Sequence, residues 1–542
     1  MTEPGVPNVE AVTPTVNRNY IIAAYILLWV VCFVDAIQQG AANALHPYVT
    51  STFFQHSLLA YINVMPGIIG GILRLPLAKV LDIFGRPHGF ALSVVFLVTG
   101  LSLMAECHSV HGFAAAQSFY WLGYNSLFYT IQVFIADTSA LKNRGLLFAY
   151  INSPYIITAW LAGPVAKSFI STFDYNRGWR WCFGIFAIVM ALFSIPLFCL
   201  FLHNYRKAAK AEVATPIRND RTTFQSIRYY MIEFDALGLF LVSGGLVFLL
   251  VPLNLFSFQK TKWASPIMIG FLVCGLVMLS LFVCYERYLA PKTVLPYRLF
   301  MDRTVLGAVT LSMVLFVSLT LWDTYFSSFL QVVYGVSIVH ATYIANIYTV
   351  GSCLFSIPVG IVIRMNGRFK WIALYFGVPV TVLGVVLMIH FRHPGQSIGF
   401  VILSQVLIAF AGGACVITEQ VAAMSAVKHE YVALVLALEG MSSSIGGGIG
   451  SSIATAIWTS VFPARIAAHL PGPHQREVEF LYSSIEFQMK YPKGDELRDA
   501  VGLAYGDTMK VLCIASTAVL ALGLVAVIMW RDIRVNNSLQ KD

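Results

Sequence analysis

One acidic residue stands inside the first long apolar stretch of the chain. Asp35 is surrounded in sequence by valine, cysteine, phenylalanine and tryptophan, and Gln38 follows it closely. A charge at the centre of a lipid bilayer costs roughly 3 kcal/mol on insertion scales, so such an acid needs a reason to be there. Apolar surroundings favour the protonated form of a carboxyl group. Asp35 therefore has the properties of a group that binds and releases a proton within a membrane.

A structural ion pair is the alternative role for Asp35, with Arg74 of the second apolar stretch as its partner. At a rise of about 1.5 Å per helical residue, Asp35 lies ~24 Å above the inner end of its stretch and Arg74 only ~9 Å above its own. This difference in depth argues against a direct pair. Proton coupling and structural pairing both stay open from the sequence.

Three further acids fall within apolar stretches and complete the set of candidate proton carriers: Asp323, Glu419 and Glu439. Asp323 has a depth similar to that of Asp35. Glu419 lies about 9 Å from the inner end of its stretch, so a structural pair with Arg74 is its alternative role. Glu439 precedes GMSSSIGGGIG, in which small residues recur at a spacing of four. That spacing is typical of closely packed membrane helices.

The fourth apolar stretch carries a polar and aromatic stripe. Its members follow one another at helical spacing and are flanked by Tyr120 and Asn125: Gln117, Trp121, Tyr124, Phe128 and Gln132. In lipid such a stripe must face protein or water, so it predicts either a cavity wall or a polar seam between helices. A wall of aromatic rings and amides suits a bulky, polar, largely uncharged ligand.

Other aromatic residues are candidates for the opposite wall of the same cavity. The ninth stretch offers Trp322, Tyr325 and Phe326 beside Asp323, with Gln331 further along, and Tyr155 and Tyr348 come from two other stretches.

The amino-acid composition indicates whether these residues belong to a soluble protein or to a membrane protein. The 542 residues are 58% hydrophobic and 11% charged, with a mean hydropathy of +0.74. A soluble protein has about 25% charged residues. We count about fourteen stretches of the ~20 mostly apolar residues that a membrane-spanning helix needs. The sequence therefore predicts an all-α membrane protein, and we expect a monomer within the lipid bilayer.

The sequence lacks the motifs that are typical of signal peptides, metal sites and common enzymes. The polar start of the chain has no basic segment before a short apolar core, so we expect no cleavable signal peptide. The nine cysteines are scattered, and no cluster has metal-ligand spacing, so we expect no resident metal or other cofactor. No phosphate-binding loop or hydrolase motif occurs, so we do not expect an enzyme.

Basic residues predict the orientation of the chain. With both termini in the cytosol, most lysines and arginines fall on the cytosolic side, as the positive-inside rule requires. The net charge of +9 then needs no nucleic-acid partner.

We expect the chain to divide into two six-helix halves with two extra helices between them. The segments are a cytosolic tail (1–18), the first half (19–202), a basic cytosolic linker (203–234), two extra helices (235–284), a cytosolic loop (285–303), the second half (304–530) and a cytosolic tail (531–542).

An internal repeat supports the two halves. LPLAKVLDIFGR (75–86) aligns without gaps on IPVGIVIRMNGR (357–368), so that Gly85 matches Gly367 and Arg86 matches Arg368. Internal repeats are the usual architecture of secondary transporters, whose substrate site lies between the repeats. We expect the repeated turns and nearby charges to form a cytosolic gate, in which Asp82 and Arg86 pair with neighbouring helix ends. The candidate gate residues are Arg74, Lys79, Asp82, Gly85, Arg86, Arg144, Arg364 and Arg368.

Three stretches and one turn resemble known families. The D-x-x-G-R turn of LDIFGRPHG (81–89) resembles the signature loop of the major facilitator superfamily. The stretches 137–169, 445–471 and 504–516 resemble the fungal siderophore–iron transporter family, and the similarity covers most of the chain.

The resemblance implies fourteen spans and import of ferric siderophores driven by the proton gradient. It implies the plasma membrane, which we favour, or endosomal vesicles. Ferric hydroxamate siderophores suit the predicted aromatic and amide wall, and their iron arrives already chelated. The alternative is a proton-coupled exporter of drugs, toxins or thiol peptides, although AGPVAKSF (162–169) departs from the pattern of drug antiporters. A sensor that keeps the transporter fold is a third hypothesis.

The last extracellular loop (464–505) is long enough to have a function of its own. QREVEFLYSSIEFQMKY and DELRDAVGLAYGD each suggest a short helix, the second capped by Asp495. We expect a lid over the outer mouth in which Tyr482, Tyr491 and Tyr505 contact the ligand, with a plain solvated loop as the alternative.

Overall fold

The computed structural model describes residues 18–52, 67–173, 175–210, 222–255, 264–293, 296, 299, 301–483 and 485–535. Every regular element in this part of the chain is helical, which confirms the all-α prediction. Eleven helices are long and apolar enough to cross a membrane, or twelve if the bent pair 224–233 and 236–252 is one span. The number fourteen stays a prediction, since part of the second expected span lies outside the described residues.

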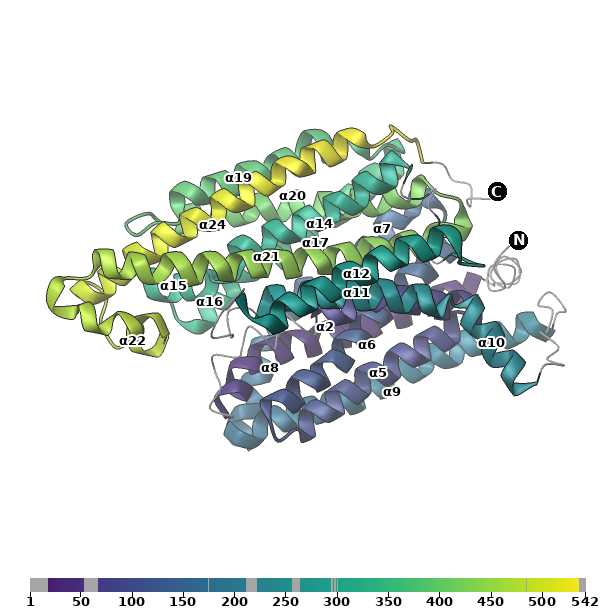
Figure 1. The fold of residues 1–542 in the computed structure, drawn as a ribbon, viewed down its shortest axis with the longest axis horizontal. Coiled ribbons are helices and arrows are strands. Elements are labelled where there is room, and N and C mark those ends of the chain that lie inside the picture. The colour runs from purple at the N-terminus through teal and green to yellow at the C-terminus, as the bar shows by residue number, and fades with distance from the viewer. Residues whose placement is uncertain are drawn as a thin grey trace.

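Most helices of the first half occupy one side of the elongated bundle in Figure 1. The helices of this half are α2 (Arg18–Thr52), α4 (Arg74–Phe84), α5 (Arg86–Glu106), α6 (Val110–Thr138), α7 (Leu141–Asn152), α8 (Pro154–Phe173) and α9 (Tyr175–Lys210). Most helices of the second half lie on the other side. They are α14 (Arg303–Asp323), α15 (Phe326–Tyr334), α16 (Ile338–Ala345), α17 (Ile347–Asn366), α18 (Lys370–Ile372), a π-helical turn (Ala373–Gly377), α19 (Val378–Phe391), α20 (Ile398–Ser425), α21 (Val432–His469) and α24 (Glu496–Met529). Helix α7 of the first half differs from its neighbours, because it lies next to α17 and α20 of the second half.

The segment between the halves forms α10 (Thr223–Glu233), α11 (Ala236–Leu255) and α12 (Pro266–Tyr288). Helices α11 and α12 pack together, and α11 contacts both α4 and α21. In Figure 1 this pair crosses the front of the bundle where the two halves meet. Helix α21 also runs along the meeting line and packs on α4 and α6 of the first half.

Three expected spans contain a short irregular turn. The fifth has one at Ser153 before Pro154, the ninth after Asp323, and the tenth at Asn346. Proline at position 154 lacks the N–H that a regular helix would use, which explains the first turn. Each span still passes as one membrane-length helix, and at Asn346 the helical hydrogen bonds continue from Asn346 N to Thr342 O and from Val350 N to Asn346 O.

The two repeated turns have the backbone geometry that the repeat predicts. Gly85 has φ +86° and ψ 167°, and Gly367 has φ +68°. Both values lie in regions that residues with a Cβ avoid. The glycines of the two matched motifs are therefore required by the turn itself.

The last outer loop is shorter than expected. Helix α21 continues to His469, and α24 begins at Glu496 with the Asp495 carboxylate accepting a hydrogen bond from Leu497 N at 3.0 Å. The cap at Asp495 is therefore confirmed, but the helix that follows it is the start of the last long helix and not a separate element. No proline interrupts that helix between 496 and 529. The loop is 470–495, with short helices at Gly472–Glu477, Val478–Ser483 (α22) and Ile485–Met489 (α23).

The predicted orientation can be tested with single cysteines at the two ends of the bundle. Glu479 in the outer loop and Lys207 at the end of α9 are both exposed. We expect Glu479→Cys to react with a membrane-impermeant maleimide in intact cells, and Lys207→Cys to react only after permeabilisation. The unsubstituted chain gives the background from its native cysteines. Labelling of Lys207→Cys alone in intact cells would reverse the orientation.

Candidate functional site

Asp35 lies in the middle of α2, and its side chain is only 4% exposed. Among the described residues its Oδ1 has no hydrogen-bond partner. It borders a space of about 240 Å³, too narrow for a water-sized sphere, that is lined by Cys32, Asp35, Leu127, Phe128, Ile131 and Tyr155. The acid is thus buried next to a small closed space and is not matched by a positive charge.

Tyrosine hydroxyls and glutamine amides surround Asp35. The hydroxyl groups of Tyr124 and Tyr155 are 2.7 Å apart, and Tyr155 donates to Gln39 Oε1 at 2.9 Å. Tyr120 donates to Gln38 Oε1 at 3.1 Å. Helix α8 supplies Tyr155, and the stripe on α6 supplies Tyr120 and Tyr124. The sequence predicted four of these five residues; Gln39 was missed, although it directly follows Gln38.

A second group of buried charges lies where α21 meets the first half. Arg74 Nη2 donates to Asn125 Oδ1 at 2.5 Å and interacts electrostatically with Glu439. Glu439 in turn interacts with Glu419 of α20 and accepts from the Ser312 hydroxyl at 3.3 Å. Depth correctly argued against an Arg74–Asp35 pair. Glu439 is the acid that interacts electrostatically with Arg74, and Glu419 lies next to Glu439.

The halves also meet at the end of the bundle that carries the signature turn. Arg86 Nε donates to Asp137 Oδ2 at 2.8 Å, and His429 Nε2 lies 3.7 Å from the other oxygen of the same carboxylate. Tyr129 of α6 donates to Ala433 O of α21 at 2.9 Å. Arg86 therefore pairs with a neighbouring helix end as predicted. The side chain of Asp82 lies outside the described residues.

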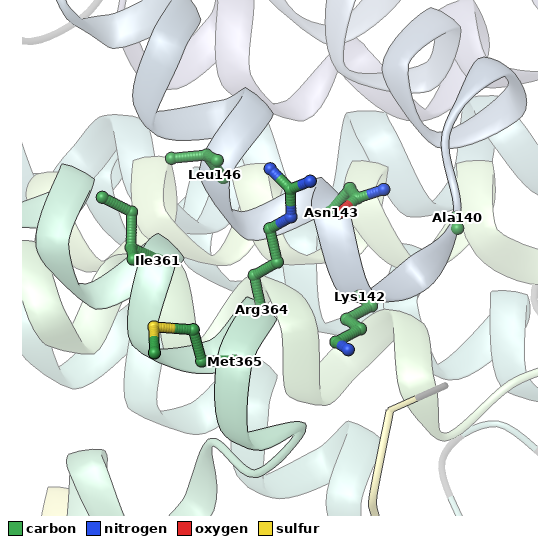
Figure 2. Close-up of a pocket in the computed structure, with 7 residues that line it drawn as sticks. All are labelled: Ala140, Lys142, Asn143, Leu146, Ile361, Arg364 and Met365. Carbon is green, nitrogen blue, oxygen red and sulfur yellow. The ribbon is translucent and has the colours of Figure 1, made fainter. Parts of the chain in front are cut away.

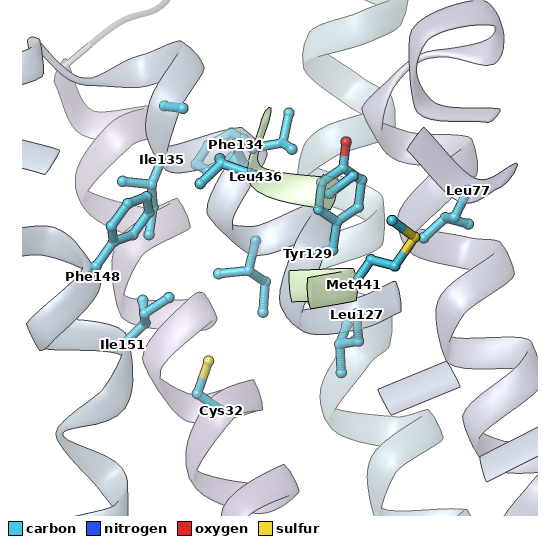
Figure 3. Close-up of a cluster of buried hydrophobic side chains, with 14 of the residues drawn as sticks. Cys32, Leu77, Leu127, Tyr129, Phe134, Ile135, Phe148, Ile151, Leu436 and Met441 are labelled. Atoms are coloured by element: carbon cyan, nitrogen blue, oxygen red, sulfur yellow. The ribbon is translucent and has the colours of Figure 1, made fainter. Parts of the chain in front are cut away.

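Apolar side chains fill the space between this end and Asp35. Figure 3 shows Leu436 and Met441 of α21 among Tyr129 and Phe134 of α6, with Cys32 nearby. All are buried. Because the cluster draws on both halves, it blocks the path from Asp35 toward the Arg86–Asp137 end in this conformation.

The other candidate gate residues differ in their surroundings. Arg144 is fully buried and donates to Ser139 O at 3.4 Å, and Lys79 is 7% exposed. Arg364 and Arg368 are both exposed. The second half thus repeats the turn, but Arg368, which matches the part-buried Arg86, is exposed.

The candidate site residues of the second half lie around the side chain of Arg392. Its guanidinium lies 4.0 Å from the ring centre of Phe326 and 5.3 Å from that of Trp322, whose carbonyl oxygen accepts from Nη1 at 2.5 Å. Asp323 is exposed and interacts electrostatically with Arg392. The sequence predicted Trp322 and Phe326 on a cavity wall; in the structure both are buried beside Arg392, a residue that was not among the predicted site residues.

The remaining predicted residues have defined positions. Gln117, Asn125 and Gln132 are buried, while Trp121, Tyr124 and Phe128 are partly exposed. Tyr348 packs edge-on against Trp322 at 5.7 Å, and Tyr325 stacks on Trp458 at 3.9 Å. No signal in a single sequence indicates which of these residues turn toward each other, because that depends on how the helices pack.

The three predicted lid tyrosines do not share one surface. Tyr505 is 2% exposed, donates to Gln488 Oε1 at 3.2 Å and packs on Trp458 and Phe462. Tyr482 lies near Phe462, and Tyr491 donates to Glu477 Oε2 at 3.0 Å. Hydrogen bonds from His474 and Tyr491 lower the pKa of Glu477. Tyr505 belongs to the base of the loop, so only Tyr482 and Tyr491 could meet a ligand.

The long helices and buried charges define a multi-pass membrane protein with the architecture of a secondary transporter. A family model described as Major Facilitator Superfamily matches residues 28–451. The chain belongs to the Major Facilitator Superfamily and, by its relatives, to the group of fungal siderochrome and siderophore iron transporters. It is therefore not a member of an enzyme family.

Two relatives illustrate the similarity in sequence. The chain is 50% identical over 533 residues to "MFS siderochrome iron transporter 1" of Ajellomyces capsulatus, covering 98% of this chain and 90% of the relative. It is 35% identical over 537 residues to "Siderophore iron transporter mirB" of Emericella nidulans, covering 99% and 88%.

Solved structures support the fold alone, because their sequences are distant. A POT family transporter in complex with 5-aminolevulinic acid gives a TM-score of 0.58 at 14% identity, covering 93% of this chain and 96% of that one. The proton:xylose symporter XylE gives 0.54 at 15% identity, covering 90% and 99%.

The contact between Arg74 and α21 can be tested with two glycines of the same helix. A Cβ at Gly440 would collide with the Arg74 guanidinium, whereas one at Gly447 would lie 4.0 Å from Thr320 Cγ2. Because the Arg74 guanidinium would have to move away from α21 to make room, we expect Gly440→Ala to lower transport severalfold and Gly447→Ala to leave it near the level of the unchanged chain. Substrate uptake, normalised to protein at the membrane, is the measurement. Equal effects of both substitutions would mean that the Arg74 contact has no special role.

Proposed function

We propose that this chain is a proton-coupled transporter that imports ferric siderophores of the hydroxamate type. The siderophore class is supported by the printed names of its relatives, which are siderochrome and siderophore iron transporters. The hydroxamate preference is supported by the uncharged aromatic and amide residues around Asp35. Import across the plasma membrane, with cytosolic termini and a monomeric chain, is part of the same proposal.

The observation that carries the proton coupling is the isolation of Asp35. Among the described residues the Oδ1 of this buried carboxyl group has no hydrogen-bond partner, and an ionised carboxylate in such surroundings is costly, so the group is held as the neutral acid. Water that enters from the outer side can deliver the proton, and water from the inner side can remove it. The acid must therefore be opened to the two sides in turn, which is what alternating access provides.

The balance of charge around Arg74 suggests that a second acid, besides Asp35, holds a proton. Glu419 and Glu439 are two acids beside one guanidinium, and both are buried. With both acids ionised the group would carry an uncompensated negative charge in a medium of low dielectric constant. We infer that Glu439 balances Arg74 and that Glu419 holds a proton. When α21 moves against the first half, Arg74 leaves Glu439 and the distribution of protons changes.

The ligand is proposed to bind between the Tyr124–Tyr155 pair and the Asp323 side of the second half. The structure is closed to so large a molecule near Asp35, because the neighbouring space is only about 240 Å³. The halves also touch at the opposite end from the signature turn, where Asn346 Nδ2 donates to Ala159 O at 3.2 Å and Trp160 packs on Tyr343. Separation of α8 from α16 would open a route to the ligand from that end.

Uptake of labelled iron tests the class of substrate and the direction. A yeast without siderophore transporters of its own would express the chain and receive several ferric hydroxamates and one ferric catecholate. We expect uptake of one or more hydroxamates, and we expect a protonophore to abolish it. No uptake of any compound by a chain present at the cell surface would contradict import and favour the exporter hypothesis.

Replacement of Asp35 tests the proton carrier separately. Asparagine has nearly the same shape but cannot titrate, so we expect Asp35→Asn to reduce accumulation to that of cells without the chain. Asp35→Glu should restore part of the uptake, because it restores the acid. Accumulation by Asp35→Asn that keeps its normal dependence on external pH would exclude Asp35 as the proton carrier.

A further inference from the structure

A cavity of about 710 Å³ lies apart from the residues around Asp35, and Figure 2 shows the side chains that line it. It is formed between the start of α7 in the first half and the end of α17 in the second. Its lining residues are Ala140, Lys142, Asn143, Leu146, Ile361, Arg364 and Met365. In Figure 2 the Arg364 side chain extends from α17 toward Asn143 and Leu146 of α7.

The polar part of the cavity is positively charged. Its two ionisable residues are Lys142 and Arg364, one from each half. Helix α7 begins here, and Ala140 at its N-cap provides no side-chain acceptor for the first backbone N–H groups. A helix start adds a partial positive charge and free donors. Two cations, an amide and these donors together match the oxygen atoms of a phosphate group.

The other part of the cavity is apolar and reaches the surface. Leu146, Ile361 and Met365 line it, with exposed fractions of 42% for Ile361 and 75% for Met365. Ile361 lies one helical turn from both Arg364 and Met365 on α17, at spacings of three and four residues. An inorganic anion gains nothing from such a wall. A phospholipid would place its phosphate between the cations and its acyl chains on the exposed apolar residues.

We propose that the cavity between α7 and α17 binds the phosphate headgroup of an anionic phospholipid. The two basic residues recognise the phosphate, and Leu146, Ile361 and Met365 receive the upper part of the acyl chains. This site is independent of the siderophore and of the proton carriers.

The position of the cavity gives the lipid a defined effect on conformation. Helices α7 and α17 approach closely, since a Cβ at Gly360 would lie 2.7 Å from Leu146 Cα. A phosphate bound in the cavity would attract one cation from each half, Lys142 of α7 and Arg364 of α17. Because the two cations belong to different halves, the lipid links the halves and favours the state in which α7 and α17 are in contact.

Binding of short-chain lipids to the full chain tests the proposal. The protein would be purified in a neutral detergent and mixed with dioctanoyl phosphatidic acid, dioctanoyl phosphatidylcholine or glycerol phosphate, with binding measured by native mass spectrometry. The test variant is Lys142→Gln/Arg364→Gln. Its matched control is Arg206→Gln/Lys207→Gln, which removes the same charge from exposed positions at the end of α9. Thermal unfolding verifies that both variants are folded.

We expect phosphatidic acid to bind at least about tenfold more tightly than phosphatidylcholine, a difference of ~1.4 kcal/mol. We expect the Lys142/Arg364 variant to lose that difference and the control variant to keep it. Equal loss in both variants would overturn the site, because it would reflect net charge alone. Binding of glycerol phosphate as tight as that of phosphatidic acid would overturn the assignment to a lipid.

Discussion

The position of the Arg74 guanidinium at the junction of the two halves, where its Nε is buried, constrains much of the structure around it. A guanidinium in a medium of low dielectric constant needs both hydrogen bonds and a counter-charge. Asn125 supplies the first from within the same half, and Glu439 supplies the second from the other half. The counter-charge is therefore available only in conformations that bring α21 against α4. The need of Arg74 for a counter-charge therefore favours the arrangement of the halves in which α21 contacts α4.

Two kinds of buried acid follow from this arrangement, and they differ in what surrounds them. Asp35 lies within the first half, among hydroxyl groups and amides, without a cation. Glu419 and Glu439 lie next to each other at the junction, and Glu439 interacts with Arg74. Opening of the junction changes the surroundings of these two acids directly, whereas the surroundings of Asp35 change only when water reaches it. In the proposed mechanism, the first half would load the proton and the junction would respond to the conformational state.

Much of the framework could be predicted from the sequence because it depends on local rules. Gly85 and Gly367 were identified by a repeat and have the backbone angles that require glycine, Asp495 caps its helix, and the polar stripe on α6 faces protein. Partners across helices could not be predicted in the same way. The different depths of Asp35 and Arg74 along their helices argued against a pair between them. Whether Glu419 or Glu439 faces Arg74, however, depends on how the helices are oriented about their axes in the packed structure. Arg392 was overlooked because it follows a span, where arginine is ordinary, and only the packing of Trp322 and Phe326 buries it.

The length of α21 has a consequence for the outer end of the molecule. Its 38 residues extend ~57 Å, and the apolar core of a bilayer is about 30 Å thick. A large part of the helix must therefore stand in water, together with the start of α24. There Trp458, Phe462 and Tyr505 pack with Leu481 into an apolar cluster of their own. This cap is stabilised by the exclusion of water, as in a soluble protein, while the rest of the chain is surrounded by lipid and gains little from that effect. The cap and the helix bundle should consequently unfold in two separate transitions when urea is added or the temperature is raised.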